Sequence, residues 1–188
     1  KPNFSMIKKI CNKNLSTPIT YCGRINNIED AIKVINCGIE RIGLGNLIFN
    51  NYKQIKKIYE AVGSQAIILI LNCEYIKGKL YIRDINNNKN ILYSDIKNRI
   101  ESLNNFYSEI VIVDTLNEGS DGKFNLNILK NIKLKKKMIL YGGMNNLKKI
   151  NQCLKNKMIS SIAIGNQLNF KEHTYQKLKK KLNSNLIR

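Results

Sequence analysis

Short apolar segments alternate with amphipathic helical segments along this chain, and this alternation limits its fold more than any other feature. The apolar segments are too short for helices and too continuously apolar for half-exposed strands, as is typical of a parallel sheet covered on both faces. We expect strands at residues 19–22, 41–44, 66–71, 109–113, 138–141 and 161–164. We expect helices at residues 27–35, 52–62, 94–103, 125–132, 147–154 and 174–182.

An insertion interrupts the alternation after the third expected strand. Residues 79–93 contain two β-rich segments joined by Asn86-Asn87-Asn88, which predicts a hairpin. The other strands follow one another at intervals of about 23 to 28 residues, the length of one βα unit. The 188 residues are one domain's worth of chain, so we expect a single domain over 1–188.

The glycines decide between the two common arrangements of βα units, a doubly wound sheet and a (β/α)₈ barrel. They recur at the carboxyl ends of the expected strands, at Gly23, Gly43, Gly45, Gly142, Gly143 and Gly165. No glycine-rich dinucleotide or P-loop motif accompanies them. Small residues at the same end of many strands favour a (β/α)₈ TIM barrel, whose βα loops face one active site. Six βα units do not close an eight-stranded barrel, so we expect a barrel truncated to about six units, with the N-terminal two missing.

Charge and cysteine content exclude several function classes. The chain has 32 basic and 13 acidic residues, a net charge of +19, but no RNP, zinc-finger or zipper motif accompanies the charge. We therefore expect a basic surface suited to phosphorylated substrates rather than nucleic acid. Five cysteines without a CxxC pair predict free thiols in a reducing cytoplasm and no metal site. No apolar run is long enough to span a membrane, and no motif indicates a cofactor.

A set of short motifs, in order along the chain, resembles the cyclase subunit of imidazole glycerol phosphate synthase. More broadly, the set is similar to the (β/α)₈ barrels of histidine biosynthesis. Gly63-Ser64-Gln65-Ala66 before an apolar strand is the most distinctive motif. The others are Pro18–Ile25 with Asn27–Ala31, Cys37–Asn46, Asn117–Ser120, Tyr141–Met144 and Ala163–Asn166.

The resemblance implies a substrate with two phosphate ends, held by backbone N–H groups at glycine turns and helix N-termini. One implied phosphate site consists of Gly119, Ser120, Gly142, Gly143, Gly165 and Asn166. The other consists of Gly23, Gly45 and Asn46. It also implies a heterodimer with a glutaminase subunit, whose ammonia passes through the barrel. Arg41 stands where the family has a lysine that helps to gate the ammonia entrance.

The resemblance fails at the two aspartates that act as general acid and base in the family. One belongs to the family's first strand, which we expect to be missing from this chain. The position of the other is Asn72, whose amide cannot exchange a proton near neutral pH. Glu118 replaces an aspartate of the loop after the family's sixth strand. Asp114, at a strand end, is either a substitute acid or base or a hydrogen-bonded structural carboxylate. We predict Asn72, Glu118 and Asp114 as the catalytic set.

Three readings of the function remain open at this point. The chain is an ammonia-using synthase subunit, a non-catalytic remnant that binds a phosphorylated ligand or a partner, or, from charge alone, a nucleic-acid binder. For the synthase, the opening Lys1-Pro2-Asn3-Phe4 resembles a paralogous branch that forms acetamidino groups on surface-polysaccharide sugars. The C-terminal run from Thr174 resembles the histidine enzyme instead. We favour the sugar-modifying branch.

Overall fold

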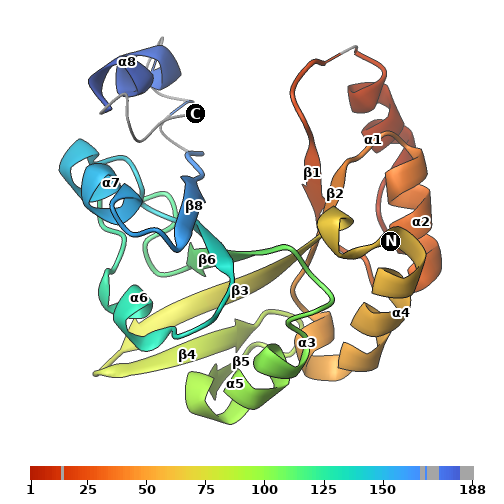
Figure 1. Cartoon of the computed structure of the whole chain (residues 1–188), viewed down its shortest axis with the longest axis horizontal. Helices are drawn as coiled ribbons and strands as arrows, with labels where there is room; N and C mark the ends of the chain where they lie inside the picture. The colour runs from red at the N-terminus through yellow and green to blue at the C-terminus, as the bar shows by residue number, and fades with distance from the viewer. Residues whose placement is uncertain (14, 166–167, 169–173, 183–188) are drawn as a thin grey trace. The chain divides into compact units, whose positions relative to one another are not determined.

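The computed structural model of the chain describes residues 1–13, 15–165, 168 and 174–182. Strands and helices alternate along it as the apolar pattern predicts (Figure 1). The strands are β1 (Thr20–Cys22), β2 (Arg41–Leu44), β3 (Ile67–Ile76), β4 (Lys79–Asp84), β5 (Lys89–Leu92), β6 (Glu109–Asp114), β7 (Lys137–Tyr141) and β8 (Ile159–Ile162).

The helices occupy the segments between the strands. They are α1 (Phe4–Cys11), α2 (Ile28–Asn36), α3 (Leu47–Asn50), α4 (Tyr52–Val62), the 3₁₀ turn η1 (Ser64–Ala66), α5 (Tyr93–Ser102), α6 (Asn127–Asn131), α7 (Leu147–Leu154) and α8 (Thr174–Lys181). Asparagine side chains fix three of the helix starts. Asn3, Asn27 and Asn146 each accept a hydrogen bond from the backbone N–H three residues ahead, which satisfies a donor that the first helical turn leaves unpaired.

The strand order confirms the barrel-type fold over the doubly wound sheet. The main path through the sheet is β1-β2-β3-β6-β7-β8, so each strand lies beside the one that precedes it in the chain once the insertion is set aside. The β1–β2, β2–β3 and β7–β8 pairs are parallel. A doubly wound sheet reverses its strand order at a switch point, and this order has no reversal. The fold is that of a truncated (β/α) barrel.

The insertion begins as an extension of β3, and the two β-rich segments of residues 79–93 follow it as β4 and β5. The expected end of this strand at Leu71 is wrong, because β3 continues to Ile76 and pairs antiparallel with β4. Lys77 and Gly78, both with positive φ, form the tight turn between the two strands. β4 pairs in turn with β5. Asn72 therefore lies inside a long strand rather than in a loop.

The chain divides into two compact units, each with its own apolar core. Unit 1 consists of Lys1–Ile70 and Asp84–Ile110, and unit 2 of Leu71–Arg83 and Val111–Arg188. In unit 1, helices α1, α2 and α4 pack beside one another along β1 and β2 (Figure 1). Its fully buried side chains include Ile42, Ile48, Ile55, Ile58, Ile67, Leu69, Ile100 and Tyr107. Those of unit 2 include Leu71, Ile82, Ile112, Phe124, Ile128, Leu140 and Ile150.

The last parallel strand differs in position from the prediction. β8 covers Ile159–Ile162, whereas the apolar run predicts 161–164. An irregularity in register between Met138 and Ile139 of β7 accompanies the shift, and Ala163 still donates its N–H to the carbonyl of Leu140. None of the helices in the described part of the chain is long and apolar enough to cross a membrane.

Candidate functional site at the glycine turns

The loops after β6 and β7 pack directly against each other in unit 2. A Cβ atom built on Gly143 would lie 2.9 Å from the carbonyl oxygen of Asn117 and 3.0 Å from the hydroxyl of Ser120. Gly143 also has φ +65°, so the position needs glycine both for its conformation and for the lack of space. The structure thus brings together Gly119, Ser120, Gly142 and Gly143, four of the six residues predicted for the first phosphate site.

Local hydrogen bonds fix the shape of the β6–α6 loop. Ser120 donates both its N–H and its hydroxyl to the carbonyl of Asn117, at 3.0 and 2.6 Å. The ammonium group of Lys149, on α7, donates to the carbonyls of Gly122 and Phe124 at 2.8 Å each. Lys149 therefore ties this loop to the helix that follows the glycine pair and brings a positive charge to it.

Asp114, the last residue of β6, accepts hydrogen bonds from two residues of the same loop. Its side chain is buried, and Oδ2 accepts hydrogen bonds from the Asn125 N–H at 2.7 Å and from the Asn117 side-chain amide at 2.8 Å. Oδ1 has no hydrogen-bond partner among the described residues. A Cβ on Gly142 would lie 2.5 Å from the Asp114 carbonyl oxygen. This geometry favours the structural alternative for Asp114.

Cys73 shows on which face of β3 Asp114 lies. Burial, and then the negative charge of Asp114, raise the pKa of the Cys73 thiol far above its ordinary value. The hydroxyl of Thr115, the residue after Asp114, lies 3.2 Å from Glu74 Oε1, so Thr115 is on the Glu74 face and Asp114 on the Cys73 face. Asn72 and Glu74 point to the other face of β3, because successive residues of a strand alternate. Asp114 is therefore on the opposite face from Asn72.

Glu118 is paired with Tyr141, the last residue of β7. Desolvation, a hydrogen bond with the Glu118 carboxylate and the charge of that carboxylate all raise the pKa of the Tyr141 phenol. A Cβ on Gly165 would lie 3.0 Å from the Tyr141 hydroxyl, so a side chain there would displace the ring. Glu118, Tyr141 and Gly165 thus form one group beside the glycine turns. Asn166, predicted with them, lies outside the described residues.

Asn72 has neighbours that the sequence analysis did not single out. The buried Glu74 shares its strand face, and Glu74 Oε1 lies 3.1 Å from the Arg83 guanidinium and 3.2 Å from the Thr115 hydroxyl. A charged residue two positions after Asn72, inside an apolar strand, is the signal that identifies this cluster. The pairing of β3 with β4, which brings Arg83 to it, was not predicted.

The residues of the second predicted phosphate site lie in unit 1. Gly23 and Gly45 follow the neighbouring parallel strands β1 and β2, and Gly23 has φ +137°. Asn46 donates from its side-chain amide to the Asn86 side chain at 2.9 Å, so the insertion loop holds it. Between the strands, a Cβ on Gly43 would lie 2.2 Å from the Cys22 sulfur, which shows how close the two strand ends approach.

Arg41 lies at the amino end of β2, the opposite end from the one that Gly45 follows. It is the first residue of β2, and its guanidinium forms a 2.6 Å ion pair with Glu109, the first residue of β6. The side chains of Arg41 and Glu109 are 41% and 19% exposed. The carboxylate of Glu109 was not predicted as part of this feature.

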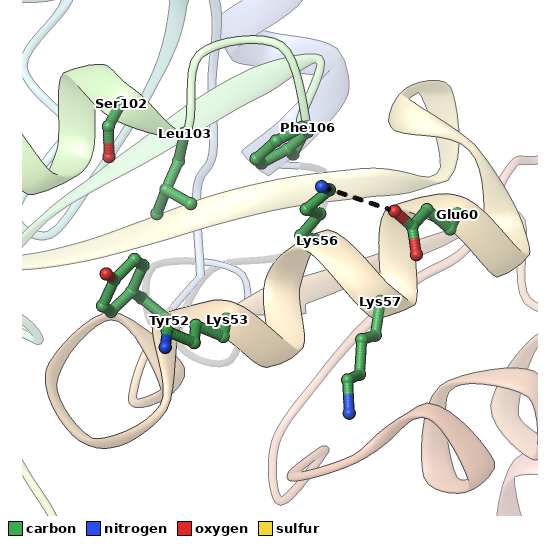
Figure 2. Close-up of a pocket in the computed structure, with 8 residues that line it drawn as sticks. All are labelled: Tyr52, Lys53, Lys56, Lys57, Glu60, Ser102, Leu103 and Phe106. Carbon is green, nitrogen blue, oxygen red and sulfur yellow. Dashed lines mark ion pairs between the residues drawn. The ribbon is translucent and has the colours of Figure 1, made fainter.

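A separate groove lies on the helical surface of unit 1 (Figure 2). It has a volume of about 500 Å³ and is lined by Tyr52, Lys53, Lys56, Lys57, Glu60, Ser102, Leu103 and Phe106. The Lys56 ammonium group lies 3.8 Å from the Glu60 carboxylate, which compensates part of the positive charge of the groove (Figure 2). The lining contains none of the predicted catalytic or phosphate-binding residues. In the described part of the chain, no group of three or more His, Cys, Asp or Glu side chains is placed to hold a metal ion.

Comparison with known proteins identifies the family. The model of the family described as histidine biosynthesis protein matches residues 1–174, nearly the whole chain. The chain belongs to this family. It is 25% identical over 184 residues to the imidazole glycerol phosphate synthase subunit HisF of Clostridium botulinum (strain 657 / Type Ba4), covering 94% of this chain and 71% of that protein.

Two further relatives carry related names. The subunit HisF of Legionella pneumophila is 24% identical over 152 residues, which cover 79% of this chain and 72% of that protein. A Vibrio vulnificus (strain YJ016) protein named as hisF3, a subunit of the same synthase, is 30% identical over 81 residues. That match covers 43% of this chain and only 30% of the Vibrio protein. The family resemblance inferred from the motifs is confirmed.

Proposed function

We propose that this chain is the barrel subunit of an ammonia-using synthase of the imidazole glycerol phosphate synthase type, acting on a phosphorylated or nucleotide-linked substrate in the cytoplasm. The observation that carries the proposal is the contact between the loop after β6 and the glycine pair after β7, in a chain of the histidine biosynthesis family. Relatives that match most of the chain are named as HisF subunits of this synthase.

The glycine turns have the properties of a phosphate site. Gly142 and Gly143 both have positive φ and no room for a side chain, so both positions need glycine. Backbone N–H groups at turns of this kind are suited to an anion. Helix α7 begins four residues after Gly143, and its N-terminal dipole favours an anion. Lys149 adds a positive charge to the same loops. We assign one phosphate of the substrate to Gly119, Ser120, Gly142, Gly143, Gly165 and Asn166, and the other to Gly23, Gly45 and Asn46.

Glu118 is the best-supported proton-transfer group. It is a carboxylate in the loop that follows β6, and its hydrogen bond to the Tyr141 phenol connects it to a second ionisable group. Asn72 is positioned in the long β3 strand and orients the substrate through its amide, which cannot transfer a proton near neutral pH. We assign Asp114 to holding the β6–α6 loop, since its bonded oxygen accepts two donors from that loop.

Ammonia would enter at the amino ends of the strands from a glutaminase partner. The Arg41–Glu109 ion pair stands at this end, and the partly exposed Arg41 guanidinium can leave it for solvent. We assign Arg41, with Glu109, to the gate of the ammonia entrance.

Purified chain tests the proposal directly. The bisphosphorylated precursor of imidazole glycerol phosphate is incubated with ammonium ions, and then with glutamine plus a glutaminase subunit. We expect ammonium-dependent product formation that falls at least about a hundredfold in Glu118→Gln, the range in which general acid–base catalysis contributes. Tyr107→Phe is the matched control, since it removes a phenol of unit 1 that is buried away from the site.

The sugar-modifying branch is tested in the same assay. A nucleotide-linked acetamido sugar replaces the imidazole precursor, and formation of the acetamidino group is followed by mass spectrometry. Turnover of this sugar alone assigns the chain to that branch, and turnover of the imidazole precursor alone assigns it to the histidine branch. Activity of Glu118→Gln equal to that of the wild type refutes the site assignment.

A non-catalytic binding role is the second candidate, and Asn72 favours it. An amide in the position of an essential aspartate leaves the phosphate sites intact while it removes a proton-transfer group. Under this function the chain binds the bisphosphorylated precursor, measured by calorimetry, without turning it over. An Asn72→Asp variant that gains turnover supports it, and turnover by the unaltered chain removes it.

A further inference from the structure

The groove of Figure 2 is separate from the glycine turns and contains none of the residues of the proposed function. It lies within unit 1, between helix α4 and the turn that follows α5. Its volume of about 500 Å³ is in the range of small-molecule sites, which occupy about 300–1,000 Å³. Because the lining combines lysines with aromatic and apolar side chains, it suits a ligand with an anionic part and a planar part.

The lysines of α4 give the groove its positive charge. Lys53 and Lys57 are one helical turn apart, and neither forms an ion pair with a carboxylate in the described part of the chain. Like charges at this spacing repel each other, so a bound anion would relieve the repulsion. Lys56 pairs with Glu60, but their side chains are 62% and 57% exposed, which makes this a weak pair. This part of the groove therefore favours an anion.

Two aromatic rings line the groove, and each is held from outside it. Phe106 packs on Tyr59, which is not part of the lining, with ring centroids 5.1 Å apart. The Arg99 guanidinium lies over the Tyr52 ring, 5.5 Å from its centroid. Arg99 is itself fixed, since it donates to the carbonyl of Ile48 at 3.1 Å. Both rings are therefore positioned before a ligand arrives, which lowers the entropic cost of binding.

The apolar and charged side chains lie along different edges of α4. Figure 2 shows Leu103 and Phe106 along one edge and the ammonium groups of Lys53 and Lys57 extending from the other. Leu103 is only 2% exposed and adds apolar surface to the lining. Nucleic-acid bases stack on aromatic rings, and lysine ammonium groups bind phosphates. A nucleoside phosphate carries a base and phosphates at the two ends of one molecule.

We propose that this groove binds a nucleoside diphosphate, with the base on Phe106 and Leu103 and the phosphates at Lys53 and Lys57. Two lysines one turn apart match two linked phosphates. An acidic peptide would neutralise the lysines but leave the rings without a planar partner, and the same holds for inorganic phosphate. The inference does not rest on the proposed function, because the two involve different residues.

Isothermal titration calorimetry on the full chain tests the inference with three probes at constant ionic strength. Adenosine diphosphate carries both parts of the ligand, adenosine only the base and ribose, and pyrophosphate only the phosphates. We expect adenosine diphosphate to bind saturably, with a dissociation constant below about 1 mM and at least about tenfold below that of either partial probe. Affinities for adenosine diphosphate and pyrophosphate that are equal would overturn the site, as would the lack of saturable binding.

Variants locate the binding. Phe106→Leu removes the stacking surface but keeps an apolar side chain, and Lys53→Gln combined with Lys57→Gln removes two exposed charges. Each is expected to weaken the binding of adenosine diphosphate about tenfold, and only the double lysine variant should also weaken that of pyrophosphate. Lys8→Gln combined with Lys9→Gln removes two exposed lysines of α1 and is the matched control, which leaves the affinity unchanged.

The remaining outcomes are equally decisive. The double lysine variant changes exposed side chains only, so it gives a result even where Phe106→Leu fails to fold. Adenosine diphosphate binding that neither groove variant weakens would overturn the groove site and place the nucleotide elsewhere, such as at the glycine turns. A loss in the α1 control equal to that in the double lysine variant would show a general effect of surface charge and overturn it too. Hexaglutamate is the final probe, and binding as tight as that of adenosine diphosphate would overturn the nucleoside assignment.

Discussion

The contact between Gly142 and the end of β6 yields a prediction whose size follows from the structure. Alanine at position 142 would place its Cβ 2.5 Å from the carbonyl oxygen and 3.1 Å from the nitrogen of Asp114. An ordinary van der Waals contact of a Cβ atom is 3.4–4 Å long, so the 2.5 Å contact is too short. The obstructing atoms belong to the backbone of a buried strand, which cannot move aside as a flexible side chain can. The alanine would also have to adopt φ +101°.

Two costs therefore add in Gly142→Ala. The left-handed conformation costs a residue with a Cβ about 1–2 kcal/mol, and forcing an extra atom into a packed region costs about 1–3 kcal/mol. We expect the free energy of unfolding to fall by about 2–5 kcal/mol. This is a large part of the total stability of a typical domain.

Gly78→Ala is the matched control in the same unit. Gly78 has φ +80°, and nothing lies within 4 Å of a Cβ built there, so only the conformational cost applies. The gain from restricting the unfolded chain is the same in both variants and cancels. Urea unfolding followed by circular dichroism should show Gly142→Ala less stable than Gly78→Ala by about 1–3 kcal/mol. Equal stabilities of the two variants would refute the close contact between Gly142 and the end of β6.

Three other predictions test the site. Glu118→Gln should lower the pKa of the Tyr141 phenol toward its ordinary value, because it removes a hydrogen-bond acceptor and a negative charge; ultraviolet absorbance measures this pKa. In the wild type, the raised pKa stabilises the fold below about pH 10. This contribution to stability is lost as the pH rises through the folded-state pKa of Tyr141. A Tyr141 titration that is unchanged by Glu118→Gln would show that the pair does not exist in solution. Asp114→Ala should lower the free energy of unfolding by about 2–4 kcal/mol, since it leaves the Asn125 N–H and the Asn117 amide without their buried acceptor; a loss below about 1 kcal/mol would argue against the loop-holding role. Arg41→Met should lower the free energy of unfolding in urea by no more than about 1 kcal/mol, because the Arg41 side chain is 41% exposed in its pair with Glu109. A much larger loss of stability would mean that the pair is a structural element and not a gate that can open.

Much of the fold was predictable from the chain itself. Continuous apolar runs separated by amphipathic segments identify buried parallel strands and covering helices, since each pattern has its own period. Five of the six expected strands start within one residue of their predicted starts, and the sixth, β8, starts two residues earlier. Helix α1 was not predicted, although Asn3 gives it a capped start.

The insertion marks the limit of this kind of prediction. The apolar run ends at Leu71, yet β3 continues to Ile76, because β4 pairs with it and satisfies its backbone groups. The two-residue turn at Lys77 and Gly78 fixes the register once these strands pair, but the apolar run that ends at Leu71 does not predict that they pair. That register puts Glu74 opposite Tyr81 and so brings Arg83 to the face of Asn72.

For the site, the sequence by itself determined which residue types stand at the strand ends. The glycines, Ser120 and Glu118 could be identified because they interrupt apolar runs at regular intervals and match a family pattern. Only the tertiary structure decided which of them meet: Gly143 against Ser120, Glu118 against Tyr141, and Arg41 against Glu109. It also decided that Asp114 faces Cys73 and not Asn72. The reason is that side-chain contacts between strands depend on which strands pair, and this pairing is set by packing across the whole sheet rather than by the sequence of one strand.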